Sequence, residues 1–113
     1  MHLAVEEAFV KKVNDAPVTA TGVVTKILPD DTEGVHHQRF VITVHSGHTV
    51  LVAHNLERAY RVPVRTGDKI EAHGSYVWNK YGGLIHNTHH DDESKHEDGW
   101  INFVGKKKSE RFD

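Results

Sequence analysis

The chain has 113 residues, a formal net charge of −2 with histidine neutral, 11 histidines and no cysteine. This length is typical of one domain with a single core, and the lack of cysteine excludes disulfides and thiolate zinc sites. The near-neutral charge excludes strong nucleic-acid binding by non-specific electrostatics alone, although the histidines make the chain more positive just below neutral pH.

The amino-terminal segment, MHLAVEEAFVKKVNDAP, predicts a short helix within residues 1–14. Val5, Phe9 and Val13 fall on one helical stripe, and Pro17 ends the pattern. Two glutamates interrupt the apolar run that a secretory signal would need, and no later run is long enough to span a membrane. We therefore expect a cytoplasmic chain without membrane contacts, and the sequence leaves its oligomeric state open.

From residue 18 onward, short β-branched runs alternate with turn residues, which is typical of an all-β barrel or sandwich. We expect strands at residues 18–28, 37–46, 49–55, 69–78 and 83–89. The connection LERAYRVPVRTG is too irregular for a strand, and Pro63 would interrupt a helix, so we expect it to cross the barrel with at most one helical turn. Five strands with such a connection after the third resemble the OB-fold.

The predicted fold is therefore all-β with one N-terminal helix, a five-stranded OB-like antiparallel barrel. A single domain is expected over residues 1–113, with the helix in 1–14 and the barrel in 17–104. Residues 105–113 are expected to form a basic, mobile tail.

The stretch GGLIHNTHHDDESKHEDGW, residues 82–100, is rich in histidine and acidic residues. On an extended strand His86 and Thr88 would share one face, so His86, His89 and His90 fit a metal site only if the strand ends and curls there. His37 begins the second strand and His54 ends the third, and these strand ends can lie on one rim. We expect at least three of these five histidines to converge, whether on a metal or on a phosphate.

The remaining histidines and the aromatic residues have less specific interpretations. Surface positions are expected for His2, His45, His48, His73 and His96. Tyr76 and Trp78 share the apolar face of the fourth strand, so core packing is favoured over base stacking, which stays open for Tyr81. The arginines of the second strand and the connection either contact phosphates or form a solvated surface.

Several motifs together resemble a known family: HHQRF, AHN, YVWNKYGGLIHNTHHDD and the later GW. From about Gly22 to Trp100 the chain is similar to the bacterial domain-of-unknown-function family 3465, which brings no established activity. Asn87 stands where a tryptophan is usual in that family, and Asp92 stands where a proline is usual. Relatives often begin with an export signal; none is expected in this sequence, so the resemblance does not predict the localisation.

The leading hypothesis is phosphodiester hydrolysis on nucleic acid, with or without a divalent ion such as Mg²⁺, Mn²⁺ or Zn²⁺. The candidate catalytic residues are His37, His54, Asn55, His86, His89 and His90. The candidate substrate-binding residues are Gln38, Arg39, Trp78, Asn79 and Thr88. The candidate metal ligands are His54, His86, His89, His90 and Asp91.

These candidates have assigned roles. One of His89 and His90 would act as general base or metal ligand. His54 and Asn55 would position the phosphate or the ion. His37 or Arg39, on the second strand, would neutralise the charge on the leaving group. Two alternatives remain open: a non-catalytic module that binds single-stranded nucleic acid or a protein, and a metal-binding protein without turnover.

Overall fold

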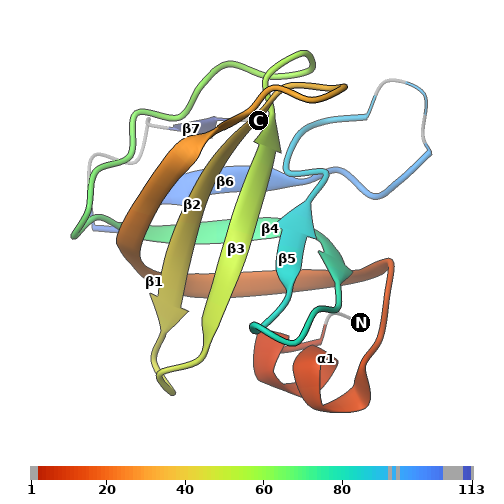
Figure 1. Cartoon of the computed structure of the whole chain (residues 1–113), viewed down its shortest axis with the longest axis vertical. Helices are drawn as coiled ribbons and strands as arrows, with labels where there is room; N and C mark the ends of the chain where they lie inside the picture. The colour runs from red at the N-terminus through yellow and green to blue at the C-terminus, as the bar shows by residue number, and fades with distance from the viewer. Residues whose placement is uncertain (1–2, 92, 94, 106–110, 113) are drawn as a thin grey trace.

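The computed structural model describes residues 3–91, 93, 95–105 and 111–112. Helix α1 (Val5–Lys11) precedes the strands β1 (Ala16–Asp31), β2 (His37–Val44), β3 (Thr49–Asn55), β4 (Lys69–Val77), β5 (Leu84–His86), β6 (Trp100–Phe103) and β7 (Arg111–Phe112). The predicted class, mostly β with one short helix, is confirmed (Figure 1). His2 and Asp92, which figured in the sequence predictions, lie outside the described residues.

Five strands close into a ring in the order β1, β2, β3, β5, β4 and back to β1. The ring closes because β1 is long enough to pair with β4 through its first half and with β2 through its second half. Gly22 belongs to both pairings, opposite Ile70 on one side and Val44 on the other. A Cβ at Gly22 would lie 2.6 Å from the carbonyl oxygen of Thr43, so only glycine allows this close approach.

The sheet is mixed, because one pair in the ring is parallel. β3 and β5 run in the same direction, with Leu51 opposite Leu84 and Val52 opposite Ile85. The prediction of an antiparallel architecture is therefore wrong for this pair, although the other pairings are antiparallel. The physical reason is the connection between β3 and β4, which crosses one end of the ring. β4 therefore does not pair with β3, and β5 lies between the two strands. β6 and β7 extend the sheet beyond β4.

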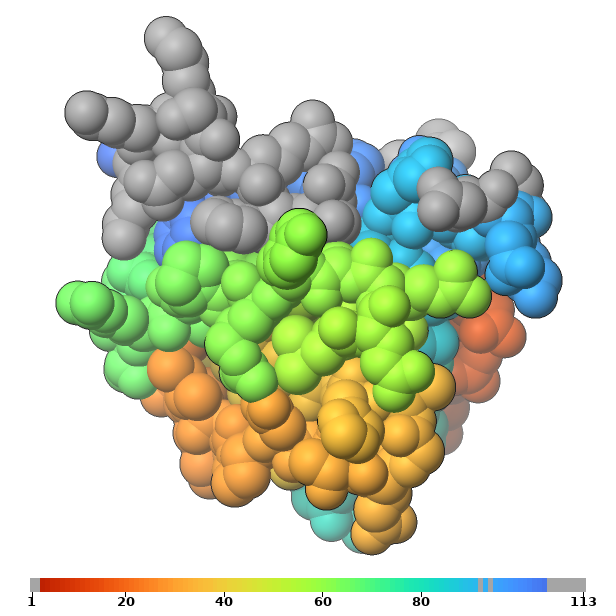
Figure 2. Space-filling model, turned by 90° about the horizontal axis from the view of Figure 1, so that it is seen from above, coloured from red at the N-terminus to blue at the C-terminus, as the bar shows by residue number. Residues whose placement is uncertain are grey.

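The two ends of the ring are covered by different segments. At the lower end in Figure 1, α1 places Val5 and Ala8 in the core. At the upper end, the connection 56–68 lies across the opening, as the green residues in Figure 2 show. It begins with a single turn, in which the amide of Ala59 donates to the carbonyl oxygen of Asn55 at 3.1 Å, and it buries Val62 and Val64 against the core. Both ends of the core are thus shielded from water.

β5 is shorter than the predicted strand 83–89. It ends at His86, because Asn87 adopts a left-handed conformation with φ of 55° and turns the chain. The turn directs the next two residues inward, so that Thr88 and His89 are both buried. The strict alternation expected for His86, Thr88 and His90 therefore fails after His86.

Candidate functional site

Three polar side chains of the family-like motifs point into the upper end of the ring. Gln38 on β2, His54 on β3 and Thr88 after β5 are all buried. Gln38 holds the overlying connection through both of its polar ends: its Nε2 donates to the carbonyl oxygen of Val62 at 2.7 Å, and its Oε1 accepts from the amide of Val62 at 2.9 Å. Gln38 therefore fastens the connection to the ring.

His54 is the second side chain that holds the connection to the ring at this end. Its Nε2 lies 2.9 Å from the carbonyl oxygen of Tyr60, which can only accept, so Nε2 carries the proton. In the neutral ring Nδ1 is then an acceptor, and the Thr88 hydroxyl at 2.7 Å donates to it. Both ring nitrogens are occupied and the side chain is fully buried. His54 therefore has a structural role, and the geometry gives no support to its predicted role in catalysis or metal binding.

The neighbouring residues on the same strands point outward instead. Arg39 pairs with Ala53, and Val52 pairs with Ile85. His86 follows Ile85, so Arg39, Ala53 and His86 form a row across β2, β3 and β5 on the outer face. Adjacent strands lie about 4.8 Å apart, which places the two outer residues of this row roughly 10 Å apart at Cα. The small side chain of Ala53 leaves the space between them open.

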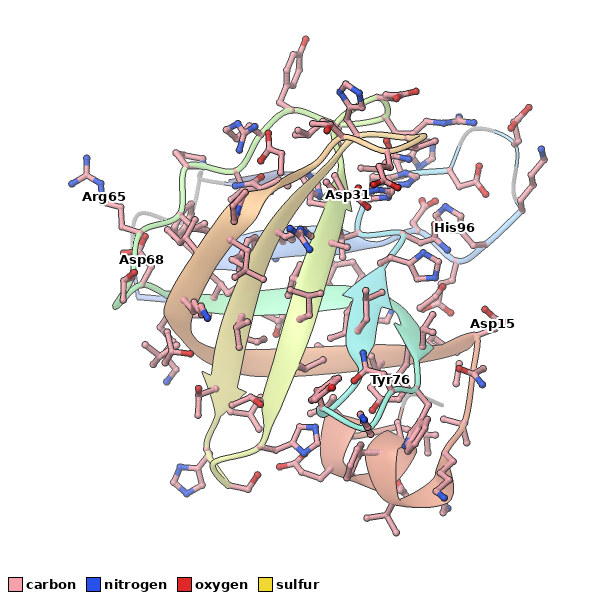
Figure 3. The ribbon with its side chains drawn as sticks, viewed as in Figure 1. Asp15, Asp31, Arg65, Asp68, Tyr76 and His96 are labelled. Atoms are coloured by element: carbon pink, nitrogen blue, oxygen red, sulfur yellow. The ribbon has the colours of Figure 1, made fainter. Side chains whose placement is uncertain are left out.

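This space is a pocket of about 240 Å³ on the outer face. Its polar lining is Asp31, His37, Arg39 and His86, and we call it the outer pocket. In Figure 3, Asp31 marks its upper edge near the ends of β1 and β3. Arg39 donates its Nε to the carbonyl oxygen of Pro29 at 2.9 Å, which fixes the guanidinium beside the pocket. The pocket thus combines two imidazoles, a guanidinium and a carboxylate.

His86 is the unusual member of the outer pocket. Its Nε2 is buried and meets no hydrogen-bond partner among the described residues. Burial lowers the pKa of His86 below the ordinary histidine value, Asp15 opposes the shift, and His37, His96 and His89 add to it. The ring is therefore neutral at neutral pH, and one of its nitrogens is a hydrogen-bond acceptor.

A second hollow, of about 380 Å³, continues from the outer pocket along the same face. The two hollows share Leu51 in their lining and lie next to each other over β1, β2, β3 and the loop after β4. Leu28, Val41 and Leu51 form its apolar floor. Lys26 and Tyr81 stand at its edges, and Tyr81 is 77% exposed. We call the combined feature the outer groove.

His89 lies in a separate place, beside the loop that leads to β6. Its Nδ1 donates to the carbonyl oxygen of His90 at 2.8 Å, and its ring meets the edge of the His96 ring at a centroid distance of 4.9 Å. Asp91 accepts the backbone amides of the following loop, among them that of His96 at 2.7 Å. Burial raises the pKa of Asp91, but the amide hydrogen bonds outweigh this effect and leave the pKa below the ordinary value. This carboxylate organises its own loop.

Among the other predicted site residues, Asn55 joins His89 and Asp91 in the lining of a separate hollow of about 130 Å³. His90 is exposed and its Nδ1 lies 2.7 Å from an oxygen of Asp98. Asn55 accepts the amide of Glu57, and Asn79 accepts the amides of Tyr81 and Gly83, so both order turns. Trp78 donates to the carbonyl oxygen of Phe9 at 3.1 Å and stacks on its ring, away from the groove.

Of the five histidines expected to converge, His37 and His86 share the outer pocket, and His89 lies near enough to contribute to the lowered pKa of His86. Within the described residues, no group of three or more His, Asp or Glu side chains is arranged to hold a metal ion. The proposed ligands His54, His89 and Asp91 already bind protein groups. The predicted metal site therefore finds no ligand set in this part of the chain.

His73 contradicts its predicted surface position. It is fully buried on the outer side of β4, where β6 covers it and the indole of Trp100 stacks on it at 4.2 Å. Its Nδ1 lies 2.6 Å from the Thr19 hydroxyl and its Nε2 lies 2.5 Å from a carboxylate oxygen of Glu97. The prediction was wrong because the pairing of β6 with β4 cannot be inferred from the alternation within β4.

Sequence reasoning also missed groove residues, although a signal was present for some. The alternation in VTATGVVTKIL places the missed residues Lys26 and Leu28 on one face, whereas base stacking was left open for Tyr81. No sequence signal identified Ala53 as the floor of the outer pocket, because that depends on the pairing of β3 with β5.

The comparison with protein families agrees with these motifs. The model of the family described as "Protein of unknown function (DUF3465)" matches residues 2–109. The chain belongs to this family. No curated protein and no solved structure matches the chain. The function of this DUF3465 member therefore has to be argued from its own geometry.

Among the described residues, α1 is too short to cross a bilayer, and no other helix provides a membrane-spanning segment.

Proposed function

We propose that this chain is an OB-like module that binds single-stranded nucleic acid in its outer groove. The supporting observation is the groove itself, which joins an apolar floor, an exposed tyrosine and two cationic side chains on one face. Single-stranded nucleic acids are bound by such combinations, since bases stack on aromatic and apolar groups while cations contact the phosphates.

The arrangement of the strands supports the same proposal by analogy. The ring order β1, β2, β3, β5, β4, with β3 and β5 parallel, resembles the topology of an OB barrel. In that fold, oligonucleotides lie over the face of the second and third strands and against the loop between the fourth and fifth. Here the same face carries Arg39 and Leu51, and the same loop carries Tyr81.

The charges of the groove fit a polyanion of low charge density better than a duplex. Lys26 and Arg39 stand on neighbouring strands, and the hydrogen bond from Arg39 to Pro29 uses only Nε, which leaves the terminal amines for a phosphate. With few cations, and with the carboxylate of Asp31 in the outer pocket, the electrostatic contribution is small, so stacking on Tyr81 must supply part of the affinity. We therefore expect modest affinity and a shallow salt dependence.

Fluorescence anisotropy with short labelled oligonucleotides tests the proposal. Single-stranded RNA or DNA should bind more tightly than the matching duplex, and Tyr81→Ala should weaken binding by about 1–3 kcal/mol. Arg39→Ala should weaken binding and reduce the slope of log K against log salt by about 0.7, the value for one phosphate contact on a single strand.

Arg65→Ala is the matched control, because Arg65 is exposed and points away from the ring at the left of Figure 3. It removes one positive charge outside the groove and should leave the affinity nearly unchanged. Equal losses for Arg39→Ala and Arg65→Ala would mean that the binding is non-specific. Absence of binding at low salt would overturn the proposal.

A further inference from the structure

The outer pocket contains more ionisable side chains than the binding of a nucleic acid requires. A groove that only held a nucleic acid would need cations and stacking surfaces, yet this end carries His86 at one end of the row that includes Arg39, and His37 beside that row on β2. His37 and Arg39 are two residues apart on β2, roughly 7 Å along the strand, and both side chains face outward. The two imidazoles and the guanidinium therefore surround one small space.

Neither imidazole is committed to another structural contact. No hydrogen bond within the described residues holds the ring of His37, and the Nε2 of His86 is buried without a partner. A buried polar atom without a partner is unfavourable, and a hydrogen bond from a ligand to this nitrogen would remove that cost. The buried His54 on the neighbouring strand shows the opposite arrangement, with both nitrogens occupied.

We propose that the outer pocket cleaves single-stranded RNA by transferring the phosphodiester to the adjacent 2′-hydroxyl, with His86 as general base, His37 as general acid and Arg39 as the phosphate clamp. This activity rests on the proposed function, because the strand must first lie in the outer groove. It requires no metal ion, since the nucleophile is supplied by the substrate.

The step balances without a further reactant. His86 removes the proton of the 2′-hydroxyl, and the 2′-oxygen forms a bond to phosphorus. The bond from phosphorus to the 5′-oxygen of the next nucleotide breaks, and protonated His37 gives its proton to that oxygen. The products are a 2′,3′-cyclic phosphate and a free 5′-hydroxyl. Arg39 neutralises the charge that builds on the non-bridging oxygens.

The substrate class follows from the residues that are present. Hydrolysis of DNA needs an activated water, usually supplied by a metal ion, and the described residues offer no ligand group of three for one. In RNA the 2′-hydroxyl lies next to the phosphorus and acts as the nucleophile. Because of this proximity, the reaction does not need a water molecule activated by a metal ion. Two imidazoles and a cation are sufficient groups for that reaction.

The decisive experiment uses the full chain in EDTA near neutral pH with labelled single-stranded RNA, the same sequence in DNA, and the DNA containing one ribonucleotide. We expect cleavage of the RNA, no cleavage of the DNA, and one cut on the 3′ side of the single ribonucleotide. Mass spectrometry should find a 2′,3′-cyclic phosphate on the upstream product.

Variants connect the activity to the pocket. His86→Gln and His37→Gln should each lower the rate of the bound complex by about 100-fold or more, the usual contribution of one acid or base. The dissociation constant, measured by anisotropy, should change far less than the rate. His45→Ala is the control, because His45 is an exposed histidine in the turn between β2 and β3, outside the outer groove.

Three outcomes would overturn the proposal. The first is intact RNA with the wild-type chain, and the second is equal cleavage of RNA and DNA. The third is an unchanged rate in His86→Gln, which would mean that a contaminating ribonuclease cleaves the RNA. Anisotropy decides separately on the proposed function: binding without cleavage would leave the groove proposal intact, whereas absence of both would overturn the two together.

Discussion

The inner and outer polar residues at the upper end of the ring differ in what surrounds them, although they alternate along the same strands. Gln38 and His54 point inward, and each polar atom that could bond meets a partner from the overlying connection or from Thr88. His37 and His86 point outward into a pocket, and a nitrogen of His86 stays without a partner. The residue type and its place in a motif thus do not predict its role. The two sets differ in whether their polar atoms have hydrogen-bond partners.

The difference has a simple origin in the ring. An inward side chain lies between the core and the connection 56–68, where an unpaired polar group has no access to water and would destabilise the fold. An outward side chain can exchange partners with solvent or with a ligand. The inner set should therefore govern stability, and the outer set should govern binding and chemistry.

His54→Ala should give the largest loss of stability. It leaves the Tyr60 carbonyl and the Thr88 hydroxyl without their partner and opens a cavity in a fully buried position. Losses of these kinds together amount to about 3–5 kcal/mol in free energy of unfolding. Urea unfolding followed by tryptophan fluorescence measures it. A loss below about 1 kcal/mol, the scale of a surface change, would contradict the structural role.

Gln38→Leu should be the next most damaging change. The leucine fills most of the space, so the cost arises from the amide and carbonyl of Val62, which lose both partners while buried. About 2–3 kcal/mol is expected, and amide hydrogen exchange of Val62 should accelerate because the connection is no longer fastened. Arg39→Leu, one residue away but facing outward, is the matched control and should cost much less.

The inward and outward faces could be predicted from the sequence where strands are regular. The alternation in HHQRFVITV correctly separates Arg39 from Phe40, because a strand of period two is set by local geometry. The same rule failed beyond His86, since Asn87 takes a left-handed conformation that ends β5. Thr88 consequently points inward to His54 instead of sharing the face of His86.

The second limit on prediction from the sequence was the pairing of strands that are distant in the chain. The parallel contact of β3 with β5 brings His86 beside Ala53, and nothing in either segment encodes that register. The cover that β6 places over His73 was missed for the same reason. Candidate residues could therefore be found from the motifs, but which of them share a pocket depends on contacts between strands distant in the chain.

His86→Leu should have a small effect of the opposite sign. Removing the ring removes a buried nitrogen that has no partner, and leucine is of similar size, so the free energy of unfolding should stay within about 1 kcal/mol of wild type or rise. Urea unfolding, run beside His54→Ala, provides the direct comparison. A loss as large as that of His54→Ala would show that His86 is a structural residue and would weaken the case for the outer pocket.

The pH dependence of stability should reveal the smallest effect, and it isolates the buried state of His86. Burial holds the pKa of His86 below its unfolded value of roughly 6.5, chiefly because the charged ring would lose hydration. Above that pH the ring is neutral in both states and contributes no slope. As the pH falls below it, the unfolded chain binds the proton first, so the free energy of unfolding decreases until the folded pKa is passed.

The test compares wild type with His86→Leu by urea unfolding at several pH values between about 5.5 and 7.5, a window chosen around the ordinary histidine value. The lowered pKa of Asp91 does not interfere, because carboxylates lose their stabilising contribution only at more acidic pH. The difference between the two proteins therefore reports His86 together with its electrostatic coupling to His37, His96 and His89. The two curves should coincide at the upper end and separate as the pH falls, with wild type losing more stability. Parallel curves would mean that His86 is as well solvated in the folded chain as in the unfolded one, and hence that its ring is not held neutral for proton transfer.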